Sequence, residues 1–142
     1  MTQTSFSAPD SKVIQSYFDA IPKRYDFLNS FLSLSFDRSW RRSLVREALQ
    51  KQKVNSILDI GAGTGTSLQA FLKANEFKLS AGCDFSQGML QVAKGKVKNT
   101  FLSAADLHHL PFADRSFELI TSSFVLRSVK DMNRFLSEVR RV

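Results

Sequence analysis

Cysteine and long apolar runs are the scarcest features of this 142-residue chain. Its single cysteine, Cys83, excludes an internal disulfide framework and is typical of a protein from a reducing compartment. The polar N-terminus has no apolar stretch of a secretory signal, and no run approaches the roughly 20 apolar residues that span a bilayer. We therefore expect a cytoplasmic protein that meets a membrane, if at all, at its surface.

Acidic residues are also in short supply, because 20 Lys and Arg outnumber 13 Asp and Glu and give a formal charge of +7. Such a surplus favours contact with anionic lipid or nucleic acid. Clusters of basic residues are more often solvated helix faces than binding sites. No motif interleaves aromatic and basic residues, so nucleic acid is not an expected partner. The 13 Phe residues are explained best by a Phe-rich core, and alternatively by a pocket for an apolar or aromatic substrate.

The spacing of apolar residues divides the chain into three parts. Residues 1–11 are expected to be disordered, residues 12–52 to form a helical lid or substrate segment, and residues 53–142 to form an α/β domain. Helices are predicted at residues 13–21, 40–50, 66–75, 86–96 and 131–142, with an apolar band at 25–36; strands are predicted at residues 54–60, 77–84, 101–104 and 117–124. Strands that alternate with helices at this spacing predict a parallel, doubly wound sheet.

A glycine loop follows the first predicted strand, in the sequence DIGAGTG at residues 59–65. Its glycines allow a tight turn and a close approach of ligand to backbone, and the helix that follows favours an anionic group at its N-terminus. The third glycine lies two residues after the second, whereas the nicotinamide fingerprint places it three residues after. This spacing disfavours a nicotinamide enzyme.

Two further carboxylates follow the next predicted strands. Asp84 ends the second strand, where a carboxylate can accept hydrogen bonds from both hydroxyls of a ribose. Asp106 follows the third strand and is placed to bind an adenine amino group. Each aspartate alone could equally be a helix cap or a turn residue. Together with Asp59 they occupy the carboxyl edge of three successive strands, where ligands bind in such sheets.

The loop and the DFSQGML segment at residues 84–90 resemble the cofactor motifs of class I S-adenosylmethionine-dependent methyltransferases. The resemblance implies a Rossmann-like class I fold, with the loop glycines beside the methionine part of S-adenosyl-L-methionine. It also implies that Asp84 holds the ribose, that Met89 packs on the adenine, and that Asp106 and Leu107 bracket the adenine edge. The cofactor contacts implied in this way are Tyr25, Asp59, Gly61, Gly63, Gly65, Asp84, Phe85, Met89, Asp106, Leu107 and Ser123.

Other segments resemble the C-methyltransferases of ubiquinone and menaquinone biosynthesis, namely RYDFLN at residues 24–29, WRR at 40–42, LPFAD at 110–114 and FVLRSV at 124–129. The resemblance implies methyl transfer to a ring carbon of a polyprenylated quinol, with Arg127 as the catalytic cation. The alternative for Arg127 is a surface cation. Two positions depart from the family pattern: Thr66 stands where an acidic residue is common, and Ser128 where Asn is common.

The remaining candidates are weaker. His108 and His109 are expected at the rim of the pocket, His108 being a minor candidate base, and no metal site is expected because the chain has no further His and only one Cys. Cys83 is expected to be a buried, inert residue.

The chain ends within a predicted helix, so we expect C-terminal strands of the fold to be missing and the exposed sheet edge to favour a homodimer. Three rival hypotheses stay open. They are a methyltransferase-like binding protein with impaired catalysis, a nucleotide-binding oxidoreductase, and a nucleic-acid methyltransferase, which has only the basic charge to support it.

Overall fold

The computed structural model describes residues 36–50 and 53–142. The predicted disorder at residues 1–11, the helix at 13–21 and the apolar band at 25–36, apart from its last residue, lie outside the described residues, as does Tyr25.

The described elements follow the predicted order of strands and helices. They are α3 (Phe36–Leu49), β1 (Ser56–Ile60), α4 (Thr66–Ala74), β2 (Leu79–Asp84), α5 (Gln87–Lys96), β3 (Phe101–Ala104), β4 (Leu119–Thr121), the 3₁₀ turn η1 (Leu126–Ser128) and α6 (Met132–Arg141). The helix expected from residue 40 therefore begins at Phe36. The strand expected at 117–124 is shorter: the Glu118 N–H donates to the Ser56 hydroxyl at 2.9 Å, and Phe124 turns into the left-handed region at φ 64°.

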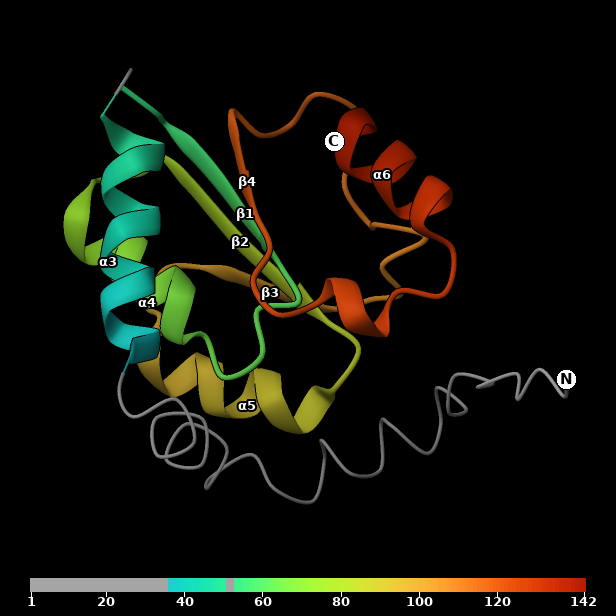
Figure 1. The fold of residues 1–142 in the computed structure, drawn as a ribbon, viewed down its shortest axis with the longest axis horizontal. Coiled ribbons are helices and arrows are strands. Elements are labelled where there is room, and N and C mark those ends of the chain that lie inside the picture. The colour runs from blue at the N-terminus through green and yellow to red at the C-terminus, as the bar shows by residue number, and fades with distance from the viewer. Residues whose placement is uncertain (1–35, 51–52) are drawn as a thin grey trace, which may run out of the picture.

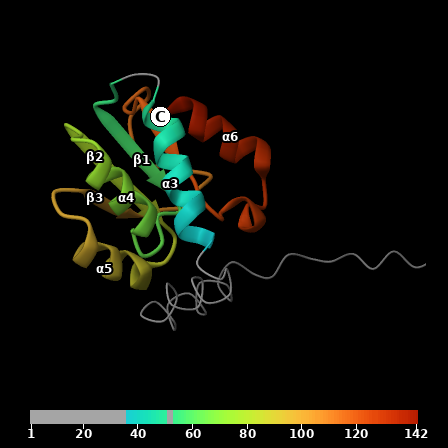
Figure 2. The same cartoon turned by 60° about the vertical axis from the view of Figure 1, so that its left-hand side comes forward.

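The four strands form one parallel sheet in the order β3-β2-β1-β4. Helices α3, α4 and α5 lie on one face and α6 on the other, which gives three layers (Figures 1 and 2). This is the doubly wound α/β architecture predicted from the sequence. The chain order reverses between β1 and β4, and such a switch point opens a crevice at the carboxyl ends of the strands.

Alternating side chains of β1 supply both halves of the core. Ile57 is fully buried with Leu68 and Phe71 in the cluster beneath α3 and α4. Leu58 and Ile60 are equally buried but belong to the cluster beneath α6. This period of two is that of a strand covered on both faces. It also places Asp59 on the same face as Ile57, toward α3 and α4.

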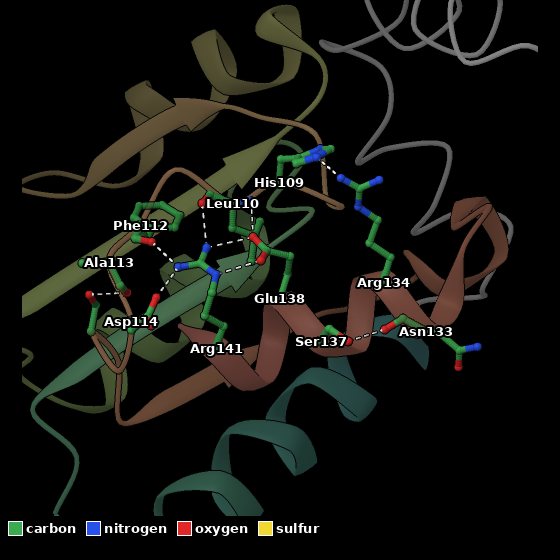
Figure 3. A network of polar contacts seen from close by, with 11 residues as sticks. His109, Leu110, Phe112, Ala113, Asp114, Asn133, Arg134, Ser137, Glu138 and Arg141 are labelled. Carbon is green, nitrogen blue, oxygen red and sulfur yellow. Dashed lines mark hydrogen bonds and ion pairs between the residues drawn. The ribbon is translucent and has the colours of Figure 1, made fainter.

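Helix α6 is fastened to the loop before β4 by one polar network (Figure 3). The guanidinium of Arg141 donates to both carboxylate oxygens of Glu138 at 2.7 and 2.8 Å, to Asp114 at 2.9 Å, and to the carbonyls of Leu110 and Phe112 at 2.9 and 2.7 Å. Glu138 in turn accepts the Leu110 N–H at 2.7 Å. Bidentate pairs of this kind fix orientation as well as adding stability.

We expect Arg141→Met to lower the urea midpoint of unfolding clearly, because Glu138 and two carbonyls lose their donors at once. The Arg141 side chain lowers the pKa of Glu138 to about 2. A lowered pKa stabilises the fold above the ordinary pKa of about 4.3 and loses that effect as the pH falls through the folded value. The acid sensitivity between about pH 4.5 and 2 should therefore shrink in the variant. Arg140→Met, at the exposed neighbouring position, is the control and should leave the midpoint unchanged.

Candidate functional site

The glycine loop lies between β1 and α4 and is held against the end of β2. The N–H groups of Gly61 and Ala62 both donate to the Cys83 carbonyl, at 2.8 and 2.9 Å. Gly61 has φ +71°, and a Cβ placed there would lie 2.1 Å from Cγ2 of Val125. Gly63 has φ +53°, and a Cβ there would meet nothing within 4 Å. The loop is thus closed by protein at Gly61 and faces open space at Gly63.

Asp84 connects the end of β2 to this loop. Its Oδ2 accepts the Gly63 N–H at 2.8 Å and its Oδ1 accepts the Ser86 N–H at 2.9 Å. The residue is only 6% exposed, so both bonds form in a poorly hydrated environment that strengthens them. Each carboxylate oxygen has more than one lone pair and can accept a further hydrogen bond from a ligand. The carboxylate is therefore held at a fixed position at the carboxyl edge of the sheet.

A cavity of about 490 Å³ opens at this edge. Five of the predicted site residues line it: Gly61, Asp84, Phe85, Asp106 and Leu107. The other lining residues are Gln87, Ala104, Ala105, His108, Val125, Ser128 and Lys130. Pockets for small molecules and cofactors measure roughly 300–1,000 Å³. The cavity is large enough for a nucleoside with a short side chain.

Asp106 is held at the cavity by His108. Its Oδ1 accepts the His108 N–H at 2.9 Å and lies 2.8 Å from His108 Nδ1. The Asp131 N–H donates to Nε2 of the same ring at 3.3 Å, which makes Nδ1 the protonated nitrogen. Partial desolvation acts to raise the pKa of Asp106, but the hydrogen bonds from His108 outweigh it and hold that pKa below its usual value. Asp106 is therefore an ionised acceptor.

Asp59 lies beneath the loop and is 1% exposed. Its Oδ1 accepts the Thr121 hydroxyl at 2.8 Å, whereas its Oδ2 has no hydrogen-bond partner among the described residues. Burial raises the pKa of Asp59 to about 7 and the charge of Asp84 adds to this rise, whereas the Thr121 hydroxyl, the charge of Arg41 and the nearby Leu68 N–H only partly oppose it. An acid of this kind is protonated in the folded chain at pH values where the unfolded chain has lost its proton.

This raised pKa predicts that the folded chain loses stability as the pH rises from about 4 toward 7, because the unfolded state gives up the proton first. Each unit of difference in pKa corresponds to about 1.4 kcal/mol, so the free energy of unfolding should fall by about 2 kcal/mol between about pH 5 and pH 7. Urea titrations of wild type and Asp59→Asn at both pH values measure it. In Asp59→Asn the free energy of unfolding should change less between the two pH values, by this amount. An equal change in wild type and variant would contradict the prediction.

Thr66, one of the two departures from the family pattern, has a local partner. Lys96 Nζ on α5 donates to the Thr66 hydroxyl at 2.9 Å, and this hydroxyl is also 3.1 Å from that of Thr64. An acidic side chain at position 66 would accept a stronger, charge-assisted hydrogen bond from the same lysine. The departure therefore lies at the contact of α4 with α5, and Thr66 does not line the cavity.

Several predicted residues lie away from the cavity. Met89 is 1% exposed within α5 and does not line it. Arg127 is exposed in η1, next to the lining residue Ser128. Ser123 lines a separate hollow. Gln87, Val125 and Lys130 line the cavity but were not selected from the sequence; the resemblance of residues 124–129 to a family motif was the available signal for Val125.

Cys83 and His109, the remaining candidates, contact other protein groups and lie outside the lining of the cavity. Cys83 is fully buried, and burial raises the pKa of its thiol to about 12, so it is inert as a nucleophile. His109 contacts Arg134 (Figure 3).

In the described part of the chain, no three His, Cys, Asp or Glu side chains are grouped as metal ligands. None of the helices at residues 36–50 and 53–142 has both the length and the apolar character needed to cross a bilayer.

A parallel sheet with a glycine loop after β1 and a fixed carboxylate after β2 defines a Rossmann-like nucleoside-binding fold, and its type is that of the class I methyltransferases. The chain belongs to the ubiE/COQ5 methyltransferase family, whose model matches residues 6–142. This membership counts against the rival prediction of an oxidoreductase.

Curated relatives agree with the family assignment. The demethylmenaquinone methyltransferase of Streptomyces avermitilis is 42% identical over 142 residues, which is 100% of this chain and 60% of that protein. The enzyme of the same name from Thermobifida fusca is 41% identical over 138 residues, covering 94% of this chain and 57% of that protein. The chain thus spans about three fifths of the length of these relatives.

Solved structures show the same fold. The YcgJ protein of Bacillus subtilis matches with a TM-score of 0.63 and 28% identity over 72% of this chain and 44% of that one. A complex from Haloferax volcanii between the Trm112 methyltransferase activator and a methyltransferase matches with a TM-score of 0.70 and 24% identity, over 95% of this chain and 56% of that one.

Proposed function

We propose that this chain carries the cofactor site of an S-adenosylmethionine-dependent C-methyltransferase that acts on a polyprenylated quinol, a demethylmenaquinol or a ubiquinol precursor. The observation that carries the proposal is the cavity at the carboxyl ends of β1, β2 and β3, lined by Gly61, Asp84 and Asp106. The family membership and the names of the two bacterial relatives support the reaction and the class of acceptor.

The residues present fit the cofactor. Asp84 would accept hydrogen bonds from the ribose, and Asp106 with Leu107 would border the adenine. The open space beside Gly63 leaves room for the methionine part of the molecule against the backbone. When bound, the cofactor supplies an electrophilic methyl group on a sulfonium. The remaining work of the chain is to orient both reactants and to favour negative charge on the acceptor.

Arg127 is the proposed catalytic cation. A ring carbon becomes a good nucleophile when the neighbouring hydroxyl loses its proton, and an always-charged guanidinium stabilises the resulting phenolate. Arg127 follows Val125 and precedes Ser128, both of which line the cavity. Its position in the short turn η1, directly after the segment that borders the cavity, would let it reach toward an acceptor bound beside the cofactor.

Calorimetric titration with S-adenosylhomocysteine tests the cofactor site, and transfer of a labelled methyl group to a demethylmenaquinol tests the reaction. Binding and transfer are expected, with transfer reduced at least a hundredfold in Arg127→Gln and binding unchanged. Arg140→Gln, on α6, is the matched control. Binding without transfer by wild type would favour the alternative of a methyltransferase-like binding protein. Absence of binding by a folded chain would contradict the proposal.

A lipophilic quinol resides in a membrane, and we propose that the chain contacts that membrane peripherally from the cytoplasmic side. Its formal charge of +7 would favour an anionic surface, with an attraction that salt screens. Co-sedimentation with anionic vesicles should therefore occur at low salt and decline at high salt. Equal binding to neutral vesicles would contradict an electrostatic contact.

We further propose a homodimer. Within the described residues β4 pairs on one side only, with β1, so its other edge offers unpaired backbone groups to a second copy. Light scattering coupled to size exclusion should give twice the chain mass of 16.0 kDa. A single monomeric species at micromolar concentration would contradict this prediction.

A further inference from the structure

A second hollow lies beside the cofactor cavity, and its lining is unusual for a surface. It measures about 220 Å³ and is lined by Trp40, Arg41, Leu44, Ser67, Ser123 and Phe124, which we call the α3 hollow. Trp40 is 59% exposed and Phe124 61%, although both are large apolar side chains. Apolar side chains that gather around a hollow mark a binding surface more often than scattered ones do.

The chain passes directly from one site to the other at the end of β4. Ser123 and Phe124 line the α3 hollow, and the next residue, Val125, lines the cofactor cavity against Gly61. Phe124 has φ 64°, a conformation that is uncommon for a bulky residue and that occurs preferentially at functional sites. This turn sends consecutive side chains to two different sites. The two sites therefore share one wall, at the switch point of the sheet.

The polar groups of the α3 hollow favour an anionic oxygen. Arg41 Nε donates to the Ser67 hydroxyl at 3.3 Å, and a guanidinium carries five N–H donors that can serve several acceptors at once. The hydroxyl of Ser123 lies in the same lining. The positive charge of Arg41 also acts to lower the pKa of the buried Asp59, so the two side chains are near each other. A flat ring with a hydroxyl or oxyanion would stack between Trp40 and Phe124 and meet these donors at its edge.

The volume of the hollow indicates which part of the acceptor it can hold, the aromatic ring or the prenyl chain. Pockets for drug-sized ligands begin at roughly 300 Å³, whereas this one is about 220 Å³. It would hold one small aromatic ring system but not a long prenyl chain. We propose that the α3 hollow binds the ring of the methyl acceptor and that Arg41 binds one of its oxygens. This assignment rests on the proposed function, because it supplies the acceptor side of the same reaction.

Trp40 is the single tryptophan of the chain, so its fluorescence reports on this hollow alone. The probes are 2-hydroxy-1,4-naphthoquinone, which is an anion at neutral pH, and the neutral 2-methyl-1,4-naphthoquinone, each titrated with S-adenosylhomocysteine present. The anion should quench Trp40 saturably, and Arg41→Gln should weaken that binding about tenfold. The neutral probe should lose little. Arg42→Gln, the next position on α3 and outside the hollow, is the matched control and should behave as wild type.

Phe124→Asn provides a second variant, since Asn tolerates positive φ but removes the aromatic wall. It should weaken both probes. Two results would overturn the assignment. One is linear quenching of Trp40 equal to that of free N-acetyltryptophanamide. The other is displacement of the anion by farnesol with the same efficiency in Arg41→Gln as in wild type. Calorimetry on the same samples separates the two proposals. Binding of S-adenosylhomocysteine without saturable quenching refutes the ring site alone, and loss of both refutes the proposed function.

Discussion

Replacing Gly61 with alanine should destabilise the fold by about 3 kcal/mol. A left-handed backbone costs a residue with a Cβ about 1–2 kcal/mol, and overpacking adds roughly 1–3 kcal/mol. Both apply, because Gly61 has φ +71° and its Cβ would lie 2.1 Å from a methyl group of Val125. Urea denaturation followed by circular dichroism measures the loss.

Gly95→Ala is the matched control for this prediction. Gly95 lies within α5, and a Cβ there would meet nothing within 4 Å. Alanine at an exposed helical position should stabilise the chain by about 0.5–1 kcal/mol. The double variant Gly61→Ala, Val125→Ala should recover the part of the loss that is due to overpacking. Equal stability of Gly61→Ala and wild type would show that the loop and the segment after β4 do not pack as described.

Replacing Asp84 with asparagine should weaken S-adenosylhomocysteine binding about a hundredfold, or about 3 kcal/mol. Asparagine keeps the shape but has a single acceptor oxygen, so it cannot accept both the Gly63 and the Ser86 N–H groups. Its amide N–H₂ would face one of those donors. The charge that favours hydrogen bonds from ribose is lost as well. Isothermal titration calorimetry measures the effect.

The control for Asp84→Asn is Glu76→Gln, which makes the same change of charge at an exposed position outside the cavity. It should bind as wild type. Thermal melting of both variants establishes that they are folded at the titration temperature. If Asp84→Asn were folded and bound with unchanged affinity, Asp84 would not be a cofactor residue.

The parts of the site that the sequence predicts are those set by local chemistry. The glycine loop and the aspartate at the end of a buried strand can be predicted because strand, loop and helix follow one another along the chain. Gly61 and Asp84 do line one cavity. The position of Asp106 can be predicted from the sequence for the same reason. Its partner His108 is only two residues away, and their hydrogen bond is equally local.

The parts that the sequence does not predict depend on contacts between distant segments. The strand expected at residues 117–124 is limited to Leu119–Thr121, and the left-handed turn at Phe124 is not predicted by its residue type. Ser123 lies two residues after Thr121, on the side of the extended chain that faces α3, and it lines the hollow there. The sequence also does not predict that Oδ2 of Asp59 lacks a hydrogen-bond partner among the described residues, because this follows from burial of the carboxyl between β4 and α4.

The central position of β1 has a consequence for how the chain folds during synthesis. β1 is the first described strand, yet one of its two neighbours is β4, and Asp59 meets its partner Thr121 only across 62 residues. Contacts of such long sequence separation form late, because the loop between them must first close. On the ribosome one edge of β1 therefore stays exposed until almost all of the described chain has emerged. Pairing of β4 then covers the second edge of β1, buries Asp59 and brings Val125 against Gly61.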